Sequence, residues 1–532
     1  MLSFKRFRWH HLLTAVAAVL VFAVLNVPNK LSALTPLAFV RLPLEGFLIA
    51  GFFLALPVRA RPAAAAVTGT LLSFLTILKL IDMGFYETLD RAFDPATDWP
   101  LLSDAAESLR RSIGRTAALG VFAGIIVALA GFTLLLAWAM RRLARLTERR
   151  ITSRVLASAV CAILGLQLVL GAPLTVSTTA SHTYNKARQV YDGVLDKGDF
   201  RAENAADAFR NTPGSGLLNG LRGKDFILAF IESYGRVALD DPELAPSMDA
   251  VLDAGSVQLT KAGFSFRSAF LTSPTAGGGS WLAHSTFLSG VWIDNQQRYT
   301  SLLASDRLTL NKAFRRAGWR TACVMSAVSQ PWPEGESFYG LDKLYLTQDL
   351  GYRGPRFTFD SVPDQFTLSS FHRLERTAAD RGPLMAEIAL MSSHGPWAPL
   401  PRSVGWDELG DGSVFTSIAE KADQATAVWS ERNRIRQAYV QAVAYSVASL
   451  LSYVEKYGDD DLVLVFLGDH QPAPVVTGEG AVRDVPITIM ARDQAVLDRI
   501  SAWGWQEGMK PGAQAPVWPM NAFRDRFLAA FS

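Results

Sequence analysis

The sequence is poor in cysteine and has no strong net charge. Its 532 residues include two cysteines, Cys161 in an apolar run and Cys323 in a β-rich segment. Two such positions offer no disulfide framework, so an exported domain would have to rely on its hydrophobic core. The formal net charge of +3 balances 52 basic against 49 acidic residues. Because nucleic-acid binding needs a clustered basic face, the composition predicts no nucleic-acid partner.

Long uncharged stretches are confined to the first third of the chain. A helix needs about 20 apolar residues to cross a bilayer core. Five stretches meet this requirement, roughly at residues 12–27, 34–56, 64–83, 116–139 and 155–176. The first follows three basic residues, but four more runs come after it and it lacks a small-residue cleavage site. We therefore expect a retained helix rather than a signal peptide, and a five-helix transmembrane domain over residues 1–178.

The charges between the apolar runs predict the orientation of these helices. Basic residues gather before the first run, after the second at Arg59 and Arg61, and after the fourth, where six arginines lie within residues 141–154. The alternate loops hold one lysine or a mixture with many acids. Basic loops favour the cytoplasm, so residues after 180 are expected outside it. This pattern predicts a multi-pass protein of the inner (plasma) membrane with a periplasmic, or extracytoplasmic, domain.

Charged residues interrupt the third apolar run. Lys79 and Asp82 are three positions apart and therefore share one helix face. Charges at membrane depth often mark function, which here would be contact with a lipid headgroup. The alternative is an ion pair between helices or side chains that extend to the membrane surface.

The rest of the chain has the pattern of a connector followed by an α/β domain. Residues 179–222 are polar and alanine-rich with helical spacing, which indicates a connector helix or linker, and residues 223–532 form the outer domain. Apolar runs of strand length occur at residues 225–234, 321–326, 385–394 and 461–470, and helical patterns at 308–317, 366–381 and 431–457. Continuous apolar strands that alternate with helices predict a mostly parallel sheet covered by helices on both faces.

Polar residues follow three of these strands at their carboxyl ends. They are Glu232, His394, Asp469 and His470. Ligands of open α/β sheets bind beyond the carboxyl ends of the strands. Each residue alone is more often a solvated acid or a packed histidine, but the combination is a ligand set for Zn²⁺, Mn²⁺ or Mg²⁺. We therefore expect one divalent metal ion at this edge.

A serine after three glycines offers a nucleophile. Ser280 ends the run Gly-Gly-Gly-Ser and precedes a helical stretch. At a helix N-terminus, backbone N–H groups favour an anionic group, and a metal ion would lower the pKa of the hydroxyl. The alternative is a plain N-cap serine after a flexible loop.

Four motifs, in the order in which they occur along the chain, resemble those of the alkaline phosphatase/sulfatase superfamily. They are Ile-Glu-Ser at Glu232, Gly-Gly-Gly-Ser to Leu-Ser-Gly over residues 277–290, Ser-Ser-His-Gly-Pro-Trp at His394, and Gly-Asp-His at Asp469 and His470. With apolar helices before the outer domain, the chain is similar to the lipoteichoic acid synthase and phosphoethanolamine transferase branch. The segment from Tyr439 also matches the helix before the last metal-ligand strand of that family.

The resemblance implies an alkaline-phosphatase-like fold and a role for each matched residue. Glu232, Asp469 and His470 would bind one divalent metal together with Ser280, which would attack phosphorus, and His394 would contact the substrate phosphate. The chemistry implied is transfer of phosphoethanolamine or phosphoglycerol from a membrane phospholipid, through a covalent Ser280 intermediate, to an envelope glycan or glycolipid. The alternatives are a sulfatase-like phosphodiesterase or other hydrolase, and a catalytically inactive envelope scaffold.

The sequence also departs from the relatives it resembles. Sulfatases carry Pro and Arg two and four positions after the residue that becomes formylglycine, where this chain has Leu282 and His284. We therefore expect an unmodified Ser280, with His284 either assisting the nucleophile or the substrate, or packing in the core. Trp332 matches a substrate-binding tryptophan of the lipoteichoic acid synthases, but the neighbouring His and Arg of that pattern are missing.

Overall fold

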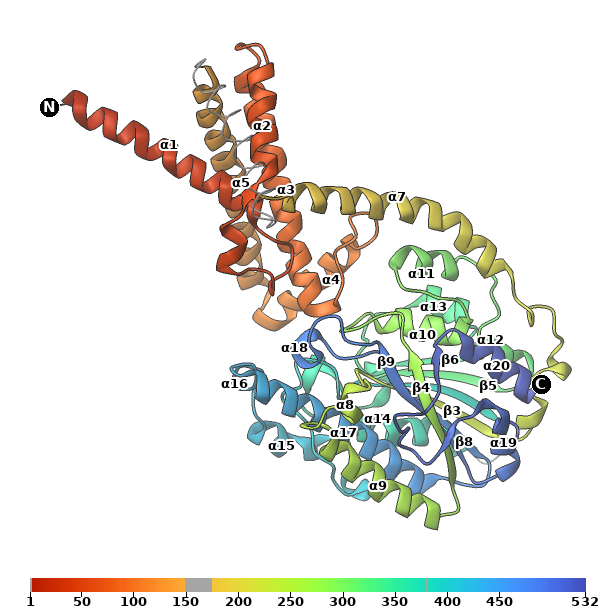
Figure 1. Cartoon of the computed structure of the whole chain (residues 1–532). Coiled ribbons are helices and arrows are strands. Elements are labelled where there is room, and N and C mark those ends of the chain that lie inside the picture. Colours follow the sequence, from red (N-terminus) through yellow and green to blue (C-terminus); the bar gives the residue numbers. More distant parts are fainter. Residues whose placement is uncertain (1, 149–174, 379–380) are drawn as a thin grey trace. The chain divides into compact units, whose positions relative to one another are not determined.

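The computed structural model describes residues 2–148, 175–378 and 381–532 (Figure 1). The chain divides into two compact units, which are Met1–Glu87 with Arg91–Asp196, and Thr88–Asp90 with Lys197–Ser532. The boundaries predicted from sequence, at residues 178 and 222, stay a prediction. Each unit is described by itself.

The first unit is helical. Among the described residues, its α-helices are α1 (Leu2–Asn26), α2 (Leu44–Ala55), α3 (Arg61–Leu89), α4 (Trp99–Ile113), α5 (Arg115–Ala144) and the start of α7 (Thr178–Ala205). Within the described residues, α1, α3 and α5 are long and apolar enough to cross a membrane. These three agree with the first, third and fourth predicted spans.

The prediction of five spans is not confirmed. The second predicted span is interrupted by a 3-10 turn at Pro36–Phe39 and a short strand, β1 (Leu42–Pro43), which leaves the 12 residues of α2. Proline removes a helical hydrogen bond, and 12 residues make about 18 Å of helix against a core of about 30 Å. Of the fifth predicted span, residues 155–174 lie outside the described part, and its last two residues form β2 (Thr175–Val176), which pairs with β1.

A buried polar network fixes α7 to the end of α3. Asp82 accepts a hydrogen bond from His182 Nε2 at 2.9 Å and forms an ion pair with Lys186 Nζ at 2.7 Å. Lys79 Nζ donates to Thr179 Oγ1 at 2.8 Å. Lys79 and Asp82 are thus both occupied by residues of α7, as the interhelical alternative anticipates. Because a buried charge without a partner is costly, these contacts stabilise the start of the connector helix.

The second unit contains a nine-stranded mixed sheet. In sheet order its strands are β10 (Gln506–Glu507), β4 (Ser265–Thr272), β9 (Asp484–Ala491), β8 (Leu462–Gly468), β3 (Asp225–Ile231), β7 (Leu384–Leu390), β5 (Arg320–Met325) and β6 (Lys343–Leu346), and β11 (Val517–Pro519) pairs with β4. The four strands predicted from apolar runs are β3, β5, β7 and β8, which are parallel to one another. The sequence did not reveal β9, which is antiparallel to β8 and β4.

Helices cover both faces of this sheet, as predicted (Figure 1). Neighbouring side chains of a strand point to opposite faces. In β3, Ile227 and Ala229 join a core with α9 (Ala245–Lys261), α14 (Asp364–Phe371) and α17 (Arg432–Tyr457). Phe226 and Leu228 join a second core with α10 (Ser280–Ser289), α12 (Leu310–Arg316) and α20 (Ala522–Phe531). The remaining helices are α8 (Val237–Asp240), α11 (Gln296–Leu303), α13 (Pro333–Tyr339), α15 (Thr416–Lys421), α16 (Ala425–Val428), α18 (Pro474–Thr477) and α19 (Gln494–Asp498).

Candidate active site

Two adjacent strands carry the acidic candidates to one place. Strand β3 lies between β7 and β8, and its last residue, Ile231, pairs with Leu390 and with Gly468. Glu232 and Asp469 are the next residues of their strands and therefore emerge side by side. A Cβ atom on Gly468 would lie 1.9 Å from the Tyr234 carbonyl oxygen, so only glycine lets the loop after β3 pass this close.

Glu232, Asp469 and His470 form one buried cluster. Each offers a ligand atom, and these atoms all lie within 4.8 Å of one another. His470 Nε2 is 3.3 Å from Glu232 Oε1 and 3.5 Å from Asp469 Oδ2. The three side chains are at most 3% exposed. Because water does not screen charges in this buried cluster, the protonation state of each group depends strongly on the charges of its neighbours.

The pKa values of the cluster reflect that dependence. Burial and then the charge of Glu232 raise the pKa of Asp469 to about 7, against the effect of His470. Burial lowers the pKa of His470, but the two carboxylates outweigh it and raise that pKa to about 9. Burial also disfavours the Glu232 carboxylate, yet His470 and His394 hold its pKa well below the usual range. Groups this close share protons, which a bound cation would replace.

Ser280 projects into the same cluster from the first residue of α10. Its Oγ donates to Glu232 Oε2 at 2.8 Å and lies 3.2 Å from His470 Nε2. The preceding residue, Gly279, has φ +80°, a left-handed conformation that glycine adopts without strain. The triple glycine therefore turns the chain so that the serine enters the cluster at the N-terminus of a helix.

These side chains fit a divalent metal ion. Two carboxylates, an imidazole nitrogen and a hydroxyl oxygen converge, and these are donors that such ions accept. His470 Nδ1 bonds to the Gln471 carbonyl oxygen at 2.8 Å, which leaves Nε2 toward the cluster. A carbonyl partner of this kind orients metal-binding histidines. The structure thus brings together the four residues proposed from sequence as metal ligands.

One loop residue joins the two carboxylates. Ser233 Oγ donates to Glu232 Oε1 at 2.9 Å, and its backbone N–H donates to Asp469 Oδ1 at 2.8 Å. Tyr439 of α17 donates its hydroxyl to the Ser233 carbonyl oxygen at 3.0 Å. The sequence did not single out Ser233, although its place directly after Glu232 was a signal. This residue keeps the two acids at a fixed separation.

His394 faces the cluster without joining it. Its Nδ1 bonds to the Gly395 carbonyl oxygen at 2.6 Å, and its ring stacks on Phe359 at 3.6 Å between centroids. Its charge is one of those that lower the pKa of Glu232. These two contacts orient the ring and do not involve Nε2. His394 is therefore placed to contact a molecule bound at the cluster.

His284 and Trp332 lie together at a small cavity beside the site. The cavity, of about 30 Å³, is also lined by Tyr339 and Glu387. His284 stacks on Phe230 at 3.7 Å between centroids, and its Nδ1 lies 3.2 Å from Glu387 Oε1. Both sequence alternatives for His284, packing and a polar role, therefore have a contact to support them. Neither His284 nor Trp332 belongs to the metal-ligand cluster.

Glu387 is a polar residue that the sequence reasoning missed. It occupies the middle of β7, is 4% exposed, and accepts a second hydrogen bond from Asn311 Nδ2 at 3.0 Å. The signal was present, because an acid inside a continuous apolar strand is costly unless it has partners. Its role is to hold the His284 ring by one nitrogen.

Residues 257–486 match a family model described as Sulfatase. This match confirms the resemblance to the alkaline phosphatase/sulfatase superfamily. No curated protein matches the chain.

Solved structures show similarity at low identity. The lipoteichoic acid synthase LtaP from Listeria monocytogenes is 14% identical, with 62% of this chain and 76% of that chain covered and a TM-score of 0.38. The C-terminal periplasmic domain of EptC from Escherichia coli, in complex with Zn, is 14% identical over 58% of this chain and 83% of that chain, with a TM-score of 0.38. The phosphoglycerol transferase GacH from Streptococcus pyogenes, in complex with sn-glycerol-1-phosphate, is 12% identical over 63% of this chain and 91% of that chain, with a TM-score of 0.35.

Proposed function

This chain carries a domain of the sulfatase family, and on that premise we propose that it is a membrane-anchored, metal-dependent transferase. It moves phosphoethanolamine or phosphoglycerol from a membrane phospholipid to an envelope glycan or glycolipid. Residues 1–178 anchor it in the inner membrane, residues 179–222 connect, and residues 223–532 act outside the cytoplasm. The observation that carries the proposal is the convergence of Ser280 with Glu232, Asp469 and His470.

In the first step the headgroup moves to the enzyme. Ser280 Oγ attacks the phosphorus of the phospholipid, a serine O–P bond forms, and the bond from phosphorus to the diacylglycerol oxygen breaks. The serine proton leaves to solvent as the new bond forms, and Glu232 Oε2, which accepts the hydrogen bond of the serine hydroxyl at 2.8 Å, holds the nucleophile in place. The diacylglycerol oxygen takes up a proton and departs. When bound, a divalent ion supplies positive charge that favours the serine alkoxide and the phosphoryl oxygens.

In the second step the headgroup moves to the acceptor. An acceptor hydroxyl attacks the same phosphorus, loses its proton, and forms the new O–P bond as the bond to Ser280 breaks. The serine oxygen regains a proton, so the enzyme is restored. His394 binds the phosphate in both steps, and His284 and Trp332 contact the headgroup from the cavity that they line.

The membrane helices give the donor a physical route. A phospholipid stays in its leaflet, because withdrawing two acyl chains into water exposes a large apolar surface. An enzyme anchored by apolar helices such as α1, α3 and α5 meets its donor at the membrane surface. A soluble domain alone would have to extract the lipid first.

Hydrolysis is the second candidate function. The family match is to sulfatases, and water can attack the same phosphorus in place of an acceptor hydroxyl. Formylglycine chemistry is disfavoured, because Leu282 and His284 occupy the positions of the maturation motif. The products separate the two functions: a hydrolase releases the free phospho-headgroup even when acceptor is present.

Release of diacylglycerol tests the proposal. The full chain in detergent is incubated with labelled phosphatidylethanolamine or phosphatidylglycerol and a divalent metal. The wild type should release diacylglycerol, Ser280→Thr should retain part of the activity because it keeps a hydroxyl, and Ser280→Ala should fall to background. Full activity in Ser280→Ala would show that the mechanism is wrong.

A further inference from the structure

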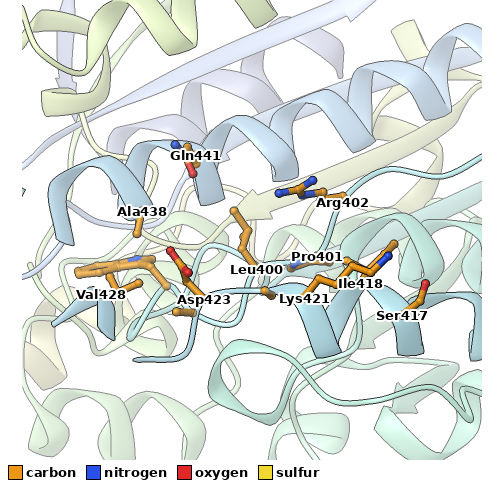
Figure 2. A pocket seen from close by; sticks show the side chains of 13 residues that line it. Leu400, Pro401, Arg402, Ser417, Ile418, Lys421, Asp423, Val428, Ala438 and Gln441 are labelled. Carbon is orange, nitrogen blue, oxygen red and sulfur yellow. The ribbon is translucent and has the colours of Figure 1, made fainter. Parts of the chain in front are cut away.

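A second cavity opens in the second unit, beside the loop that follows His394. It has a volume of about 410 Å³ and lies among residues 397–402, helix α15, the segment before α16, and α17 (Figure 2). Sites for small ligands typically have volumes of about 300–1,000 Å³. Its lining, drawn from the described residues, includes neither Ser280 nor any residue of the cluster of Glu232, Asp469 and His470. It is therefore a separate place to bind a molecule.

The charge of this cavity is positive. Arg402 and Lys421 line it from two different segments, and neither forms an ion pair with any residue that the structure describes (Figure 2). The acid in the lining, Asp423, pairs with Arg434 Nη2 at 3.1 Å. Its charge is thus balanced by an arginine outside the lining. Arg402 and Lys421 are therefore two cations without a partner carboxylate, and they favour a ligand that carries a carboxylate or a phosphate.

Other groups around the cavity suit a sugar. Ser417 and Gln441 place exposed polar side chains in the lining, where they can bond to hydroxyl groups.

Hydrogen bonds connect the wall of the cavity to the metal-ligand cluster. Trp397 lines the cavity and donates its indole N–H to the Ser393 carbonyl oxygen at 2.8 Å. Ser393 Oγ donates to the Glu232 carbonyl oxygen at 2.6 Å. Both tryptophan and serine are buried. A ligand in the cavity therefore rests on the loop that also carries His394.

We propose that this cavity is the acceptor subsite, and that it binds a sugar bearing a carboxylate or a phosphate. Arg402 and Lys421 bind the anionic group, Ser417 and Gln441 bind hydroxyls, and the acceptor chain continues toward the phosphorylated serine. The inference rests on the proposed transferase function. It narrows the acceptor to an anionic glycan or glycolipid headgroup.

Sugar binding to the full chain in detergent tests this assignment. The probes are glucuronic acid and glucose, measured by ligand-observed saturation-transfer NMR. The wild type should bind glucuronic acid more tightly than glucose. The double variant Arg402→Gln with Lys421→Gln should lower the affinity for glucuronic acid by about tenfold per lost charge-assisted bond and leave the affinity for glucose nearly unchanged. Gln441→Ala should weaken both sugars, and Lys261→Gln, an exposed charge outside the lining, is the matched control.

Three outcomes would overturn the assignment. One is equal affinity of the wild type for the two sugars, and another is an unchanged affinity of the double variant for glucuronic acid. The third is that the double variant loses binding to phosphatidylglycerol vesicles but still binds both sugars, which would make the cavity a lipid-headgroup contact. These binding measurements need no turnover. A negative result for the cavity can therefore be distinguished from a negative result in the diacylglycerol assay, which tests the transferase function.

Discussion

Tyr439→Phe removes one hydroxyl that holds the loop between the two acids of the candidate active site. Tyr439 is fully buried, and its hydroxyl donates to the Ser233 carbonyl oxygen at 3.0 Å. Ser233 has φ +57° and bonds to both Glu232 and Asp469. The phenylalanine variant keeps the ring and its packing. The change therefore isolates one hydrogen bond behind the metal-ligand cluster.

The expected cost is that of a single buried hydrogen bond. The Ser233 carbonyl keeps a bond from the Gly235 N–H at 2.8 Å, so it is not left without a partner. The second contact of the hydroxyl, with the Gly235 N–H at 3.4 Å, is too long to add much. We expect a loss of about 1 kcal/mol in the free energy of unfolding, which for a unit of this size lowers the melting temperature by about 1–2 °C.

Tyr234→Phe is the matched control. Tyr234 is also fully buried, but its hydroxyl has no hydrogen-bond partner among the described residues. Removing a buried group without a partner should leave the melting temperature unchanged or raise it. Thermal unfolding of the full chain in detergent, followed by tryptophan fluorescence with and without Zn²⁺ or Mn²⁺, measures both variants. Tyr439→Phe should also reduce the stabilisation by metal. Equal effects of the two substitutions would refute the reasoning.

Three further predictions concern the metal, a buried acid and a histidine partner. Removing divalent ions with EDTA should lower the melting temperature of the wild type more than that of Asp469→Asn, and equal shifts would contradict a metal centre at this cluster. Burial raises the pKa of Asp364 to about 6, so the folded chain binds the extra proton and loses stability as pH rises from about 4 to 6. Asp364→Asn keeps an oxygen for the N–H groups of Met391 and Ser392, so it should be more stable than the wild type at about pH 8, by at most about 3 kcal/mol, and lose this advantage near pH 4. Glu387→Gln should lower kcat, because an amide oxygen holds the His284 ring more weakly than a carboxylate does, and an unchanged kcat would leave Glu387 a purely structural role.

The second unit and its candidate site could be predicted largely because their signals are local. The strands β3, β5, β7 and β8 are continuous apolar runs, and parallel strands place their carboxyl ends at one edge. Glu232, Asp469 and His470 could therefore be placed together from the order of residues alone. The triple glycine before Ser280 likewise indicated a turn and a helix start within a few residues.

The missed features depend on partners distant in sequence. Strand β9 is an apolar run whose antiparallel direction follows from its pairing with β8 and β4, which no local pattern specifies. Lys79 and Asp82 looked like neighbours on one helix, but their partners lie about a hundred residues later in α7. The second predicted span is not confirmed for a local reason, because hydropathy does not register the break that Pro36 and Pro43 impose.

The covalent state of Ser280 during turnover is the most direct measurement of the central claim. The wild type is incubated with phosphatidylethanolamine or phosphatidylglycerol and a divalent metal, without acceptor, then denatured in acid, digested and analysed by mass spectrometry. The account predicts phosphoethanolamine or phosphoglycerol on Ser280, and loss of the adduct when a glycan acceptor is added before denaturation. Diacylglycerol release with an unmodified Ser280, or with the adduct on another residue, would contradict it.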